Sequence, residues 1–211
     1  MKLTLTNHSG LGGNINVALR CPHCGHFGTF LPLNSDLVEN RTGGEKIIFG
    51  QRMCPNTICK GHLLFFANTA RKIIDTYPTE TIPFDKNGIP DRILNAFTEA
   101  IVCHSNNCFT ASAIMIRKTL EEICSHESCK GKNLKERLQA LGGKIMIPKE
   151  LIDGMDDLRL LGNDAAHIEA NTFEQIGRNE IEISIEFTKE ILKATYQYEN
   201  LLSKLRSLKK A

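Results

Sequence analysis

The chain has 211 residues, of which 41% are hydrophobic and 24% are charged, and its formal net charge at pH 7 is +2. This length allows one domain of ordinary size with a small appended module, and the near-neutral charge excludes a protein that binds nucleic acid through bulk electrostatics alone. No stretch approaches the roughly 20 consecutive apolar residues of a transmembrane helix, and Asn7 and His8 stand where a signal peptide would have its apolar core. We therefore expect a cytoplasmic protein with no membrane partner.

The first 80 residues are predicted to form a small antiparallel β unit. Short β-type runs alternate there with Gly, Asn and Pro turns. The runs are Asn16–Arg20, Phe27–Leu31, Lys46–Gln51, Leu63–Ala67 and Arg71–Tyr77. This part carries 8 Lys and Arg against 5 Asp and Glu, a charge of +3, so it is the mildly basic half of the chain.

Two cysteine pairs in this β unit have the spacing of zinc knuckles. Two residues separate Cys21 from Cys24, four separate Cys54 from Cys59, and a glycine follows each pair closely. In a knuckle, a tight turn directs two thiolates at one tetrahedral ion. We predict one structural Zn²⁺ per chain, held by these four cysteines in a zinc ribbon over residues 1–80; the alternative is four unrelated buried thiols. Four thiolates close the shell, so the ion has no open position for a substrate.

Residues 81–90 are predicted to be a linker, and residues 91–211 a helical bundle. Pro83, Gly88 and Pro90 disfavour both helix and central strand in the linker. Apolar residues then recur every three or four positions, as in amphipathic helices. We expect two antiparallel helices joined near His104–Asn107, a short helix over Leu134–Leu141, a fourth that begins at Pro148, and a long one from Gln175 to about Leu208. The predicted fold class is α+β, a β zinc ribbon followed by an all-α bundle of four to five helices.

The long last helix carries an apolar seam with steps of three and four residues. The seam contains Phe187, Ile191, Ala194, Tyr198, Leu201, Leu205 and Leu208. Such a seam fits packing inside the bundle and pairing with its copy in a dimer equally well.

Four further cysteines, in two pairs, do not predict a second metal site. The pairs are Cys103 with Cys108 and Cys124 with Cys129. If Cys108 and Cys124 lie near opposite ends of one helix, about 16 residues at about 1.5 Å per residue put them roughly 24 Å apart. We interpret all four as small apolar thiols at helix ends.

Three polar residues of the predicted fourth helix lie along one face, because Arg159, Asn163 and His167 recur every four positions. Arginine binds phosphate through a planar fork of donors, and a histidine that titrates near neutrality can move the protons of phosphodiester cleavage. These are the parts of a metal-independent ribonuclease. The alternative is structural, with Asn163 and His167 bonded to a neighbouring helix and Arg159 paired with a carboxylate. The candidate partners of Arg159 are Glu121, Glu122 and Asp156.

Several segments, together with the cysteine pairs, resemble the bacterial family called domain of unknown function 4145, and the resemblance covers most of the chain. The segments are Ile116–Ile123, Asn133–Leu138, Ile147–Leu151 and Leu158–His167. That family is grouped with the HEPN superfamily of helical bundles, many of which are ribonucleases of toxin, restriction and antiphage systems, while others bind RNA or serve as assembly modules. The resemblance implies a HEPN-like fold, a homodimer with one composite site, and metal-independent cleavage of RNA to a cyclic phosphate.

The chain departs from the pattern of active members at one place. That pattern has an arginine, a polar residue directly after it, and a histidine, with four to six residues between the arginine and the histidine. Here Gly162 precedes Asn163, and seven residues separate Arg159 from His167. Either Arg159 reaches across one helical turn, or Arg117 from a neighbouring helix supplies the guanidinium.

Two functions of different classes follow. In the first, the protein is an endoribonuclease of a bacterial defence, restriction or toxin-type system, with His167 as general acid or base, Arg159 as phosphate clamp and Asn163 as orienting group. In the second, it is a non-catalytic module, whose helical bundle dimerises or docks in a defence assembly and whose zinc ribbon contacts nucleic acid or a partner protein.

Overall fold

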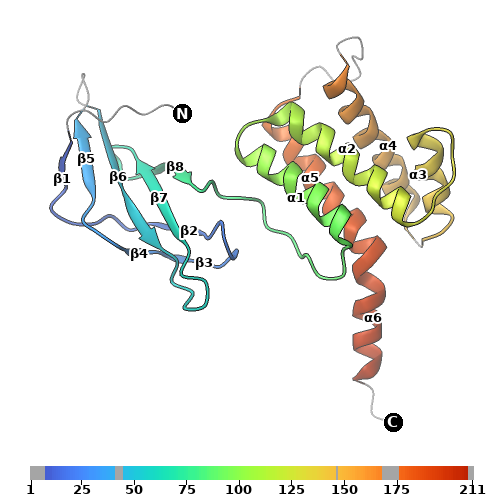
Figure 1. Ribbon diagram of the computed structural model, residues 1–211, viewed down its shortest axis with the longest axis horizontal. Helices are drawn as coiled ribbons and strands as arrows, with labels where there is room; N and C mark the ends of the chain where they lie inside the picture. Colours follow the sequence, from blue (N-terminus) through green and yellow to red (C-terminus); the bar gives the residue numbers. More distant parts are fainter. Residues whose placement is uncertain (1–7, 41–44, 146, 168–175, 209–211) are drawn as a thin grey trace. The chain divides into compact units, whose positions relative to one another are not determined.

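The computed structural model describes residues 8–40, 45–145, 147–167 and 176–208 (Figure 1). The chain divides into two compact units, Met1–Pro83 and Phe84–Ala211. In the described residues, the first unit is built from β-strands and the second from helices. The predicted α+β fold class is therefore confirmed, and the division between the units falls within residues 81–90.

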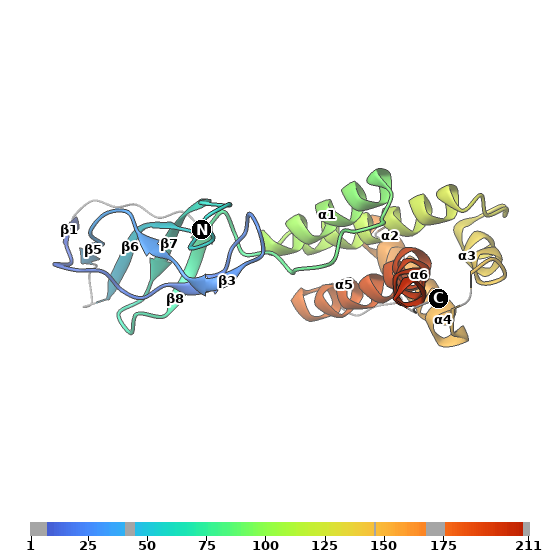
Figure 2. The same cartoon turned by 90° about the horizontal axis from the view of Figure 1, so that it is seen from below.

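One antiparallel sheet dominates the β unit, with the strand order β1-β5-β6-β7-β8 and β4 paired to the end of β6 (Figures 1 and 2). Its strands are β1 (His8–Gly10), β4 (Leu31–Pro32), β5 (Leu37–Asn40), β6 (Lys46–Met53), β7 (His62–Ala67) and β8 (Ile73–Tyr77). A separate two-stranded sheet joins β2 (Ala18–Arg20) to β3 (Phe27–Thr29). Every predicted β run overlaps a strand, whereas β1 and β5 were not predicted from the sequence.

The core of the β unit lies on one face of the sheet. Along β7, Leu63, Phe65 and Ala67 are buried, while Leu64 between them is 39% exposed, as the alternation of side chains in a strand requires. The other buried apolar residues of this core are Ile15, Val17, Leu19, Cys21, Phe30, Val38, Ile48 and Cys54. Because this list includes two of the knuckle cysteines, the cysteine cluster is continuous with the core.

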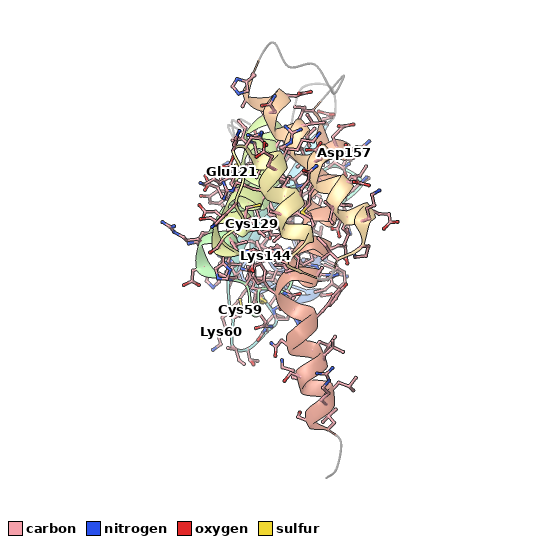
Figure 3. The ribbon with its side chains drawn as sticks, turned by 90° about the vertical axis from the view of Figure 1, so that its right-hand side faces the viewer. Cys59, Lys60, Glu121, Cys129, Lys144 and Asp157 are labelled. Carbon is pink, nitrogen blue, oxygen red and sulfur yellow. The ribbon has the colours of Figure 1, made fainter. Side chains whose placement is uncertain are left out.

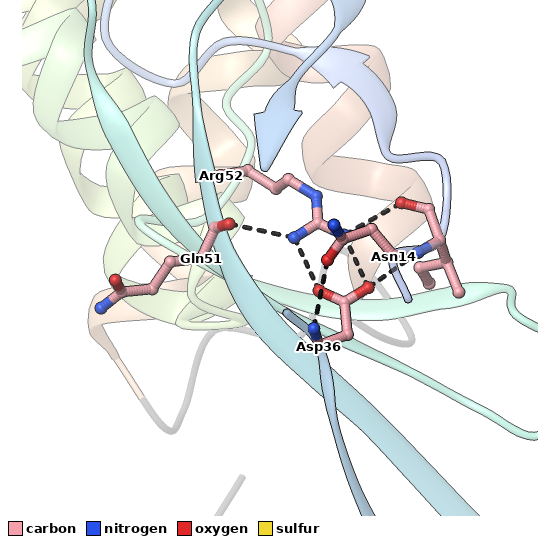
Figure 4. A network of polar contacts seen from close by, with 5 residues as sticks. Asn14, Asp36, Gln51 and Arg52 are labelled. Atoms are coloured by element: carbon pink, nitrogen blue, oxygen red, sulfur yellow. Dashed lines mark hydrogen bonds and ion pairs between the residues drawn. The ribbon is translucent and has the colours of Figure 1, made fainter. Parts of the chain in front are cut away.

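The β unit also contains a buried ion pair, Arg52 with Asp36 (Figure 4). Arg52 on β6 donates from Nη1 and Nη2 to the two carboxylate oxygens of Asp36, both at 2.7 Å, and both side chains are fully buried. The main chain of Ile15 donates to Asp36 Oδ2 at 2.7 Å and accepts from Arg52 Nη2 at 2.9 Å. The guanidinium lies 4.4 Å from the ring centroid of Phe65. Both charges are thus hydrogen-bonded as well as paired, as burial demands.

The helical unit contains six α-helices among the described residues. They are α1 (Asp91–Ser105), α2 (Phe109–His126), α3 (Leu134–Gly142), α4 (Lys149–Ala166), α5 (Arg178–Leu192) and α6 (Tyr198–Ser207), and a π-helical turn, η1 (Lys193–Gln197), joins α5 to α6. Helix α2 is central, because it packs against α1, α3, α4 and α5. Its apolar stripe is fully buried at Ala113, Ile116, Leu120 and Ile123, which recur at steps of three and four residues. None of the helices in the described parts of the chain is long and apolar enough to cross a membrane.

The second half of the predicted linker packs on the helices of its own unit. The ring of Phe84 meets that of Phe97 on α1 edge-on, with centroids 4.8 Å apart, and Ile89 is 7% exposed. The side-chain amide of Gln197 donates to the carbonyl oxygens of Asp85 and Asn87. Residues 84–90 are therefore a strap on the bundle, held by apolar contacts that proline and glycine counts do not reveal.

The predicted last helix is continuous from α5 through η1 to α6, but its apolar seam has two different environments. Ile191 on α5 is fully buried in the bundle. Helix α6 extends beyond the bundle (Figure 1), and Tyr198, Leu201 and Leu205 on it are 47%, 64% and 61% exposed. The first part of the seam therefore packs inside the bundle, whereas the second part packs on no described residue closely enough to be buried.

Candidate functional site

The four knuckle cysteines form one compact cluster. The Sγ atoms of Cys21, Cys24, Cys54 and Cys59 all lie within 4.8 Å of one another. The Sγ atoms of Cys21 and Cys59 are 3.9 Å apart, and those of Cys24 and Cys54 are 3.8 Å apart. Four sulfurs bound tetrahedrally at about 2.3 Å from one ion are about 3.8 Å apart. The cluster therefore has the size and the donor set of a tetrathiolate metal site.

The first knuckle is the turn between β2 and β3. The amide of Cys21 donates to the carbonyl oxygen of His26 at 2.8 Å, and the amide of Gly25 donates to that of Cys21 at 2.9 Å. Gly25 has φ of +74°, in the left-handed region where a glycine is favoured. Gly25 thus allows the backbone to make the tight turn of the knuckle.

The second knuckle lies between β6 and β7 and uses its glycine differently. The left-handed residue is Lys60, with φ of +48°, and not Gly61. A Cβ atom at Gly61 would stand 2.3 Å from the ring of His23. His23 Nε2 lies 2.8 Å from the carbonyl oxygen of His62, so this ring joins the two knuckles. Gly61 is therefore required for close packing between the knuckles and not for backbone curvature.

Two thiols of the cluster have pKa values that are shifted in opposite directions. A hydrogen bond from the backbone of His26 is the largest cause of lowering the pKa of Cys24, to about 7. Burial raises the pKa of Cys54 to about 12, so this thiol ionises only when a positive charge compensates it. The amide of Gly61 also donates to Cys59 Sγ at 3.4 Å. Such donors stabilise thiolate ligands around a bound metal.

On α4, Arg159 forms an ion pair with Asp156. Its Nε donates to Asp156 Oδ1 at 2.6 Å, and its side chain is 18% exposed. This hydrogen bond is the largest cause of the lowered pKa of Asp156. Lys135 of α3 lies 3.5 Å from the other oxygen of the same carboxylate. Asp156 was one of the three carboxylates that the sequence offered as a structural partner for Arg159.

At Gly162, helix α4 packs closely against α2. A Cβ atom there would lie 2.5 Å from Arg117 Cβ and 3.1 Å from the carbonyl oxygen of Ala113. The position before Asn163 therefore has no room for an arginine side chain. Arg117 itself occupies this place, with Nη1 donating to the carbonyl oxygen of Arg159 at 3.3 Å and Nε paired with Glu121 at 3.3 Å.

Asn163 and His167 are accessible at the end of α4. Asn163 is half-buried and His167 is exposed. The backbone amide of His167 donates to the carbonyl oxygen of Asn163 at 3.0 Å, and His167 leaves the helix in an extended conformation. Arg159 and Asn163 thus lie in α4, whereas His167 follows the end of this helix and is exposed.

A polar pocket of about 350 Å³ adjoins this region between α3 and α4. Its lining includes Lys135, Asp153, Asp156 and Asp157, so most of its charged groups are acidic. Sequence reasoning did not find this pocket, because it depends on how α3 packs against α4. Its acidic lining disfavours phosphate groups close to Arg159.

The other four cysteines lie at the ends of helices. Cys103 is in the last turn of α1, Cys108 precedes α2, Cys124 is in the last turn of α2 and Cys129 follows it. Burial raises the pKa of Cys124 to about 12, and this thiol is fully buried. In the described residues, the cluster in the β unit is the one group of cysteines, histidines and carboxylates placed to share an ion.

A family model described as domain of unknown function (DUF4145) matches residues 98–211. No curated protein and no solved structure matches the chain.

Proposed function

Because the chain belongs to the DUF4145 family, we propose that it is a HEPN-like protein of a bacterial defence, restriction or toxin-type system whose helical unit is a non-catalytic assembly module. The observation that carries the proposal is the ion pair of Arg159 with Asp156 at 2.6 Å. The Asp156 carboxylate accepts from Arg159 Nε and offsets its charge, which weakens the attraction of this guanidinium for a phosphate. The closed position of Gly162 points the same way, since the arginine of active family members has no space there.

The proposal assigns one structural Zn²⁺ to the cysteine cluster. Four thiolates satisfy a tetrahedral ion completely, so the metal would hold the β2–β3 hairpin to the turn between β6 and β7 and would activate no water. Reduced thiols that bind zinc are typical of the cytoplasm, which supports a cytoplasmic location for this protein. The zinc therefore belongs to the folding of the β unit and not to catalysis.

The β unit would contact a partner protein or a nucleic acid through its exposed surface. Phe27, beside the first knuckle, is 63% exposed, and Ile58, inside the second, is 94% exposed. These two residues are the first to substitute in a search for the partner.

The test of the non-catalytic assignment is incubation of zinc-loaded protein with end-labelled total RNA, without added divalent ions. A strong chelator is left out, because removal of zinc would unfold the β unit. We expect the RNA to stay intact with the wild-type protein and with His167→Ala. Cleavage by the wild type that is lost in His167→Ala would overturn the assignment.

A metal-independent endoribonuclease is the second candidate, favoured by the position of Arg117. This side chain lies against Gly162, next to Asn163, where the family pattern has its arginine. In this alternative, Arg117 binds phosphate, His167 transfers the proton, and two copies form the site. Cleavage would then fall in Arg117→Lys, which keeps the charge but loses the planar fork of donors.

A further inference from the structure

Helix α6 presents a continuous apolar face to solvent, which we call the α6 face. Its members are Tyr198, Leu201, Leu202, Leu205 and Leu208, which are between 47% and 78% exposed. Helix α6 extends away from the other helices of its unit in two different views (Figures 1 and 3). Single exposed leucines are ordinary, but four apolar side chains on one side of a ten-residue helix, with a fifth directly after its end, are typical of a binding surface.

A complementary surface lies on the same unit, between α4 and α5, and we call it the α4/α5 groove. It has a volume of about 270 Å³ and a mainly apolar lining that includes Leu158, Ile183 and Phe187. Ile183 at its edge is 70% exposed. The groove exists because Gly154 lets the two helices approach: a Cβ atom there would stand 2.2 Å from the ring of Phe187.

The charges of the two surfaces are opposite. Helices α4 and α5 carry 4 Lys and Arg against 9 Asp and Glu, a net charge of −5, and Asp157 and Glu180 line the groove itself. Asp157 is labelled on the α4 surface in Figure 3. Helix α6 carries 2 Lys and Arg against 1 Glu, a net charge of +1, with Lys204 and Arg206 in its last turn. The groove therefore offers acidic partners to Lys204 and Arg206.

The α6 face does not reach the groove of its own chain. Leu201 lies fourteen positions after Phe187 along α5, η1 and α6, which is about 21 Å at about 1.5 Å per residue. Because α6 continues away from the groove (Figure 1), folding it back would require breaking the helix at η1. The occupant must come from another molecule.

We propose that the α6 face of one copy binds in the α4/α5 groove of a second copy, and that the exchange is reciprocal. A two-fold axis then generates two equal contacts, in which Leu201 and Leu205 fill the groove beside Ile183 while Lys204 and Arg206 face Asp157 and Glu180. The inference rests on the proposed assembly function and names the first partner in that assembly, a copy of the same chain.

The test is the mass of the purified zinc-loaded protein in solution by light scattering after gel filtration, for the wild type and three single variants. Ile183→Glu blocks the groove, and Leu205→Glu blocks the α6 face. Val102→Glu on α1 is the matched control, since Val102 is also an exposed apolar side chain, at 45%, but belongs to neither surface. All three positions are exposed, and circular dichroism verifies that each variant is folded.

We expect dimers for the wild type and Val102→Glu, and monomers for both other variants. A 1:1 mixture of Ile183→Glu and Leu205→Glu should form a heterodimer, because one intact groove still meets one intact α6 face. A wild type that stays monomeric at its highest soluble concentration would overturn the proposal. So would a dimeric Ile183→Glu beside a monomeric Leu205→Glu, which would mean that α6 pairs with α6. Neither result bears on RNA cleavage, so failure of this inference is separate from failure of the non-catalytic assignment.

Discussion

The β unit and the helical unit stabilise themselves by different means. The β unit buries a charged pair, Asp36 with Arg52, and gathers four thiols into one cluster. The helical unit buries a larger apolar interior around α2, in which Phe97, Ile116 and Leu120 are fully buried. A small unit covers too little apolar surface to offset the loss of chain entropy, so it needs cross-links or metals. The difference shows which unit depends on particular bonds and which depends on packing.

Metal removal should have the largest effect, and it should unfold the β unit but not the helical unit. Zinc binding in small zinc-finger sites is worth about 10–16 kcal/mol at pH 7, so Cys54→Ser should prevent the β unit from folding while the helices persist. Elemental analysis should give one zinc per wild-type chain and little in the variant, and two-dimensional NMR should show loss of the strand amides alone. Cys108→Ser, an exposed thiol outside the cluster, is the control and should retain its zinc. Equal zinc content in both variants would contradict the assignment of the ligands.

Loss of the buried cation should be the next largest effect. Arg52→Met leaves the Asp36 carboxylate buried without its partner, which costs about 3–5 kcal/mol. Urea unfolding of the zinc-loaded protein measures this change in the free energy of unfolding. The double variant Asp36→Leu with Arg52→Met should recover much of the loss, because no charge remains buried. Lys72→Met, at an exposed position of the same unit, should change little. If Arg52→Met matched this control, the ion pair would have no special role.

In the helical unit, a single methyl group at the contact of α2 with α4 should be destabilising. Gly162→Ala places a Cβ atom 2.5 Å from Arg117 Cβ, and overpacking of this kind costs about 1–3 kcal/mol. Helix propensity alone predicts the opposite sign. Thermal unfolding is the measurement. Gly143→Ala is the control, because the nearest atom to its added Cβ is Ala140 O at an ordinary 3.6 Å. A stabilised Gly162→Ala would show that the two helices can move apart at no cost.

The smallest effect should be a pH dependence from His104 on α1. This side chain is buried, and burial is the main cause that lowers its pKa, with Arg178 adding to it and Glu182 opposing it. The unfolded chain then binds more protons than the folded one below the ordinary histidine pKa of about 6.5. Stability should therefore fall as the pH drops through that value, and His104→Gln should flatten the profile of the unfolding temperature between about pH 7 and pH 5. His126→Gln, at an exposed histidine, is the control. A profile unchanged by His104→Gln would contradict this origin.

Spacing along the chain was enough to predict the cysteine cluster and most of the secondary structure. Cys21 with Cys24 and Cys54 with Cys59 each lie within one turn, so their geometry is local, and the period of Ala113, Ile116 and Leu120 is a property of one helix. The strands β1 and β5 were missed because their residues do not alternate: β1 reads His-Ser-Gly, and β5 contains a buried Glu39. Pairing with neighbouring strands stabilises them, and that pairing is not local.

The candidate site was predicted only in outline. The repeat of four predicted one helical face for Arg159, Asn163 and His167. Arg159 and Asn163 do lie in α4, but this helix ends at Ala166 and His167 follows it in an extended conformation. The functional reading of these residues stays a prediction. The sequence offered three carboxylates for Arg159, and the fold places Asp156 against it. It also left open whether Arg117 stands near Asn163; the crossing of α2 over Gly162 brings it there.

Local pattern and three-dimensional packing therefore contribute different parts of this protein. The order of a β unit and a helical unit and the faces of the helices follow from periods of two to four residues, because backbone geometry alone sets those periods. The cysteine cluster follows from two short spacings, Cys21 to Cys24 and Cys54 to Cys59. Only the folded chain shows that Gly162 has no space for a side chain, that the last apolar seam is buried at Ile191 and open at Leu205, and that α4 and α5 form a groove. These features depend on which elements meet, and residues distant in sequence decide that.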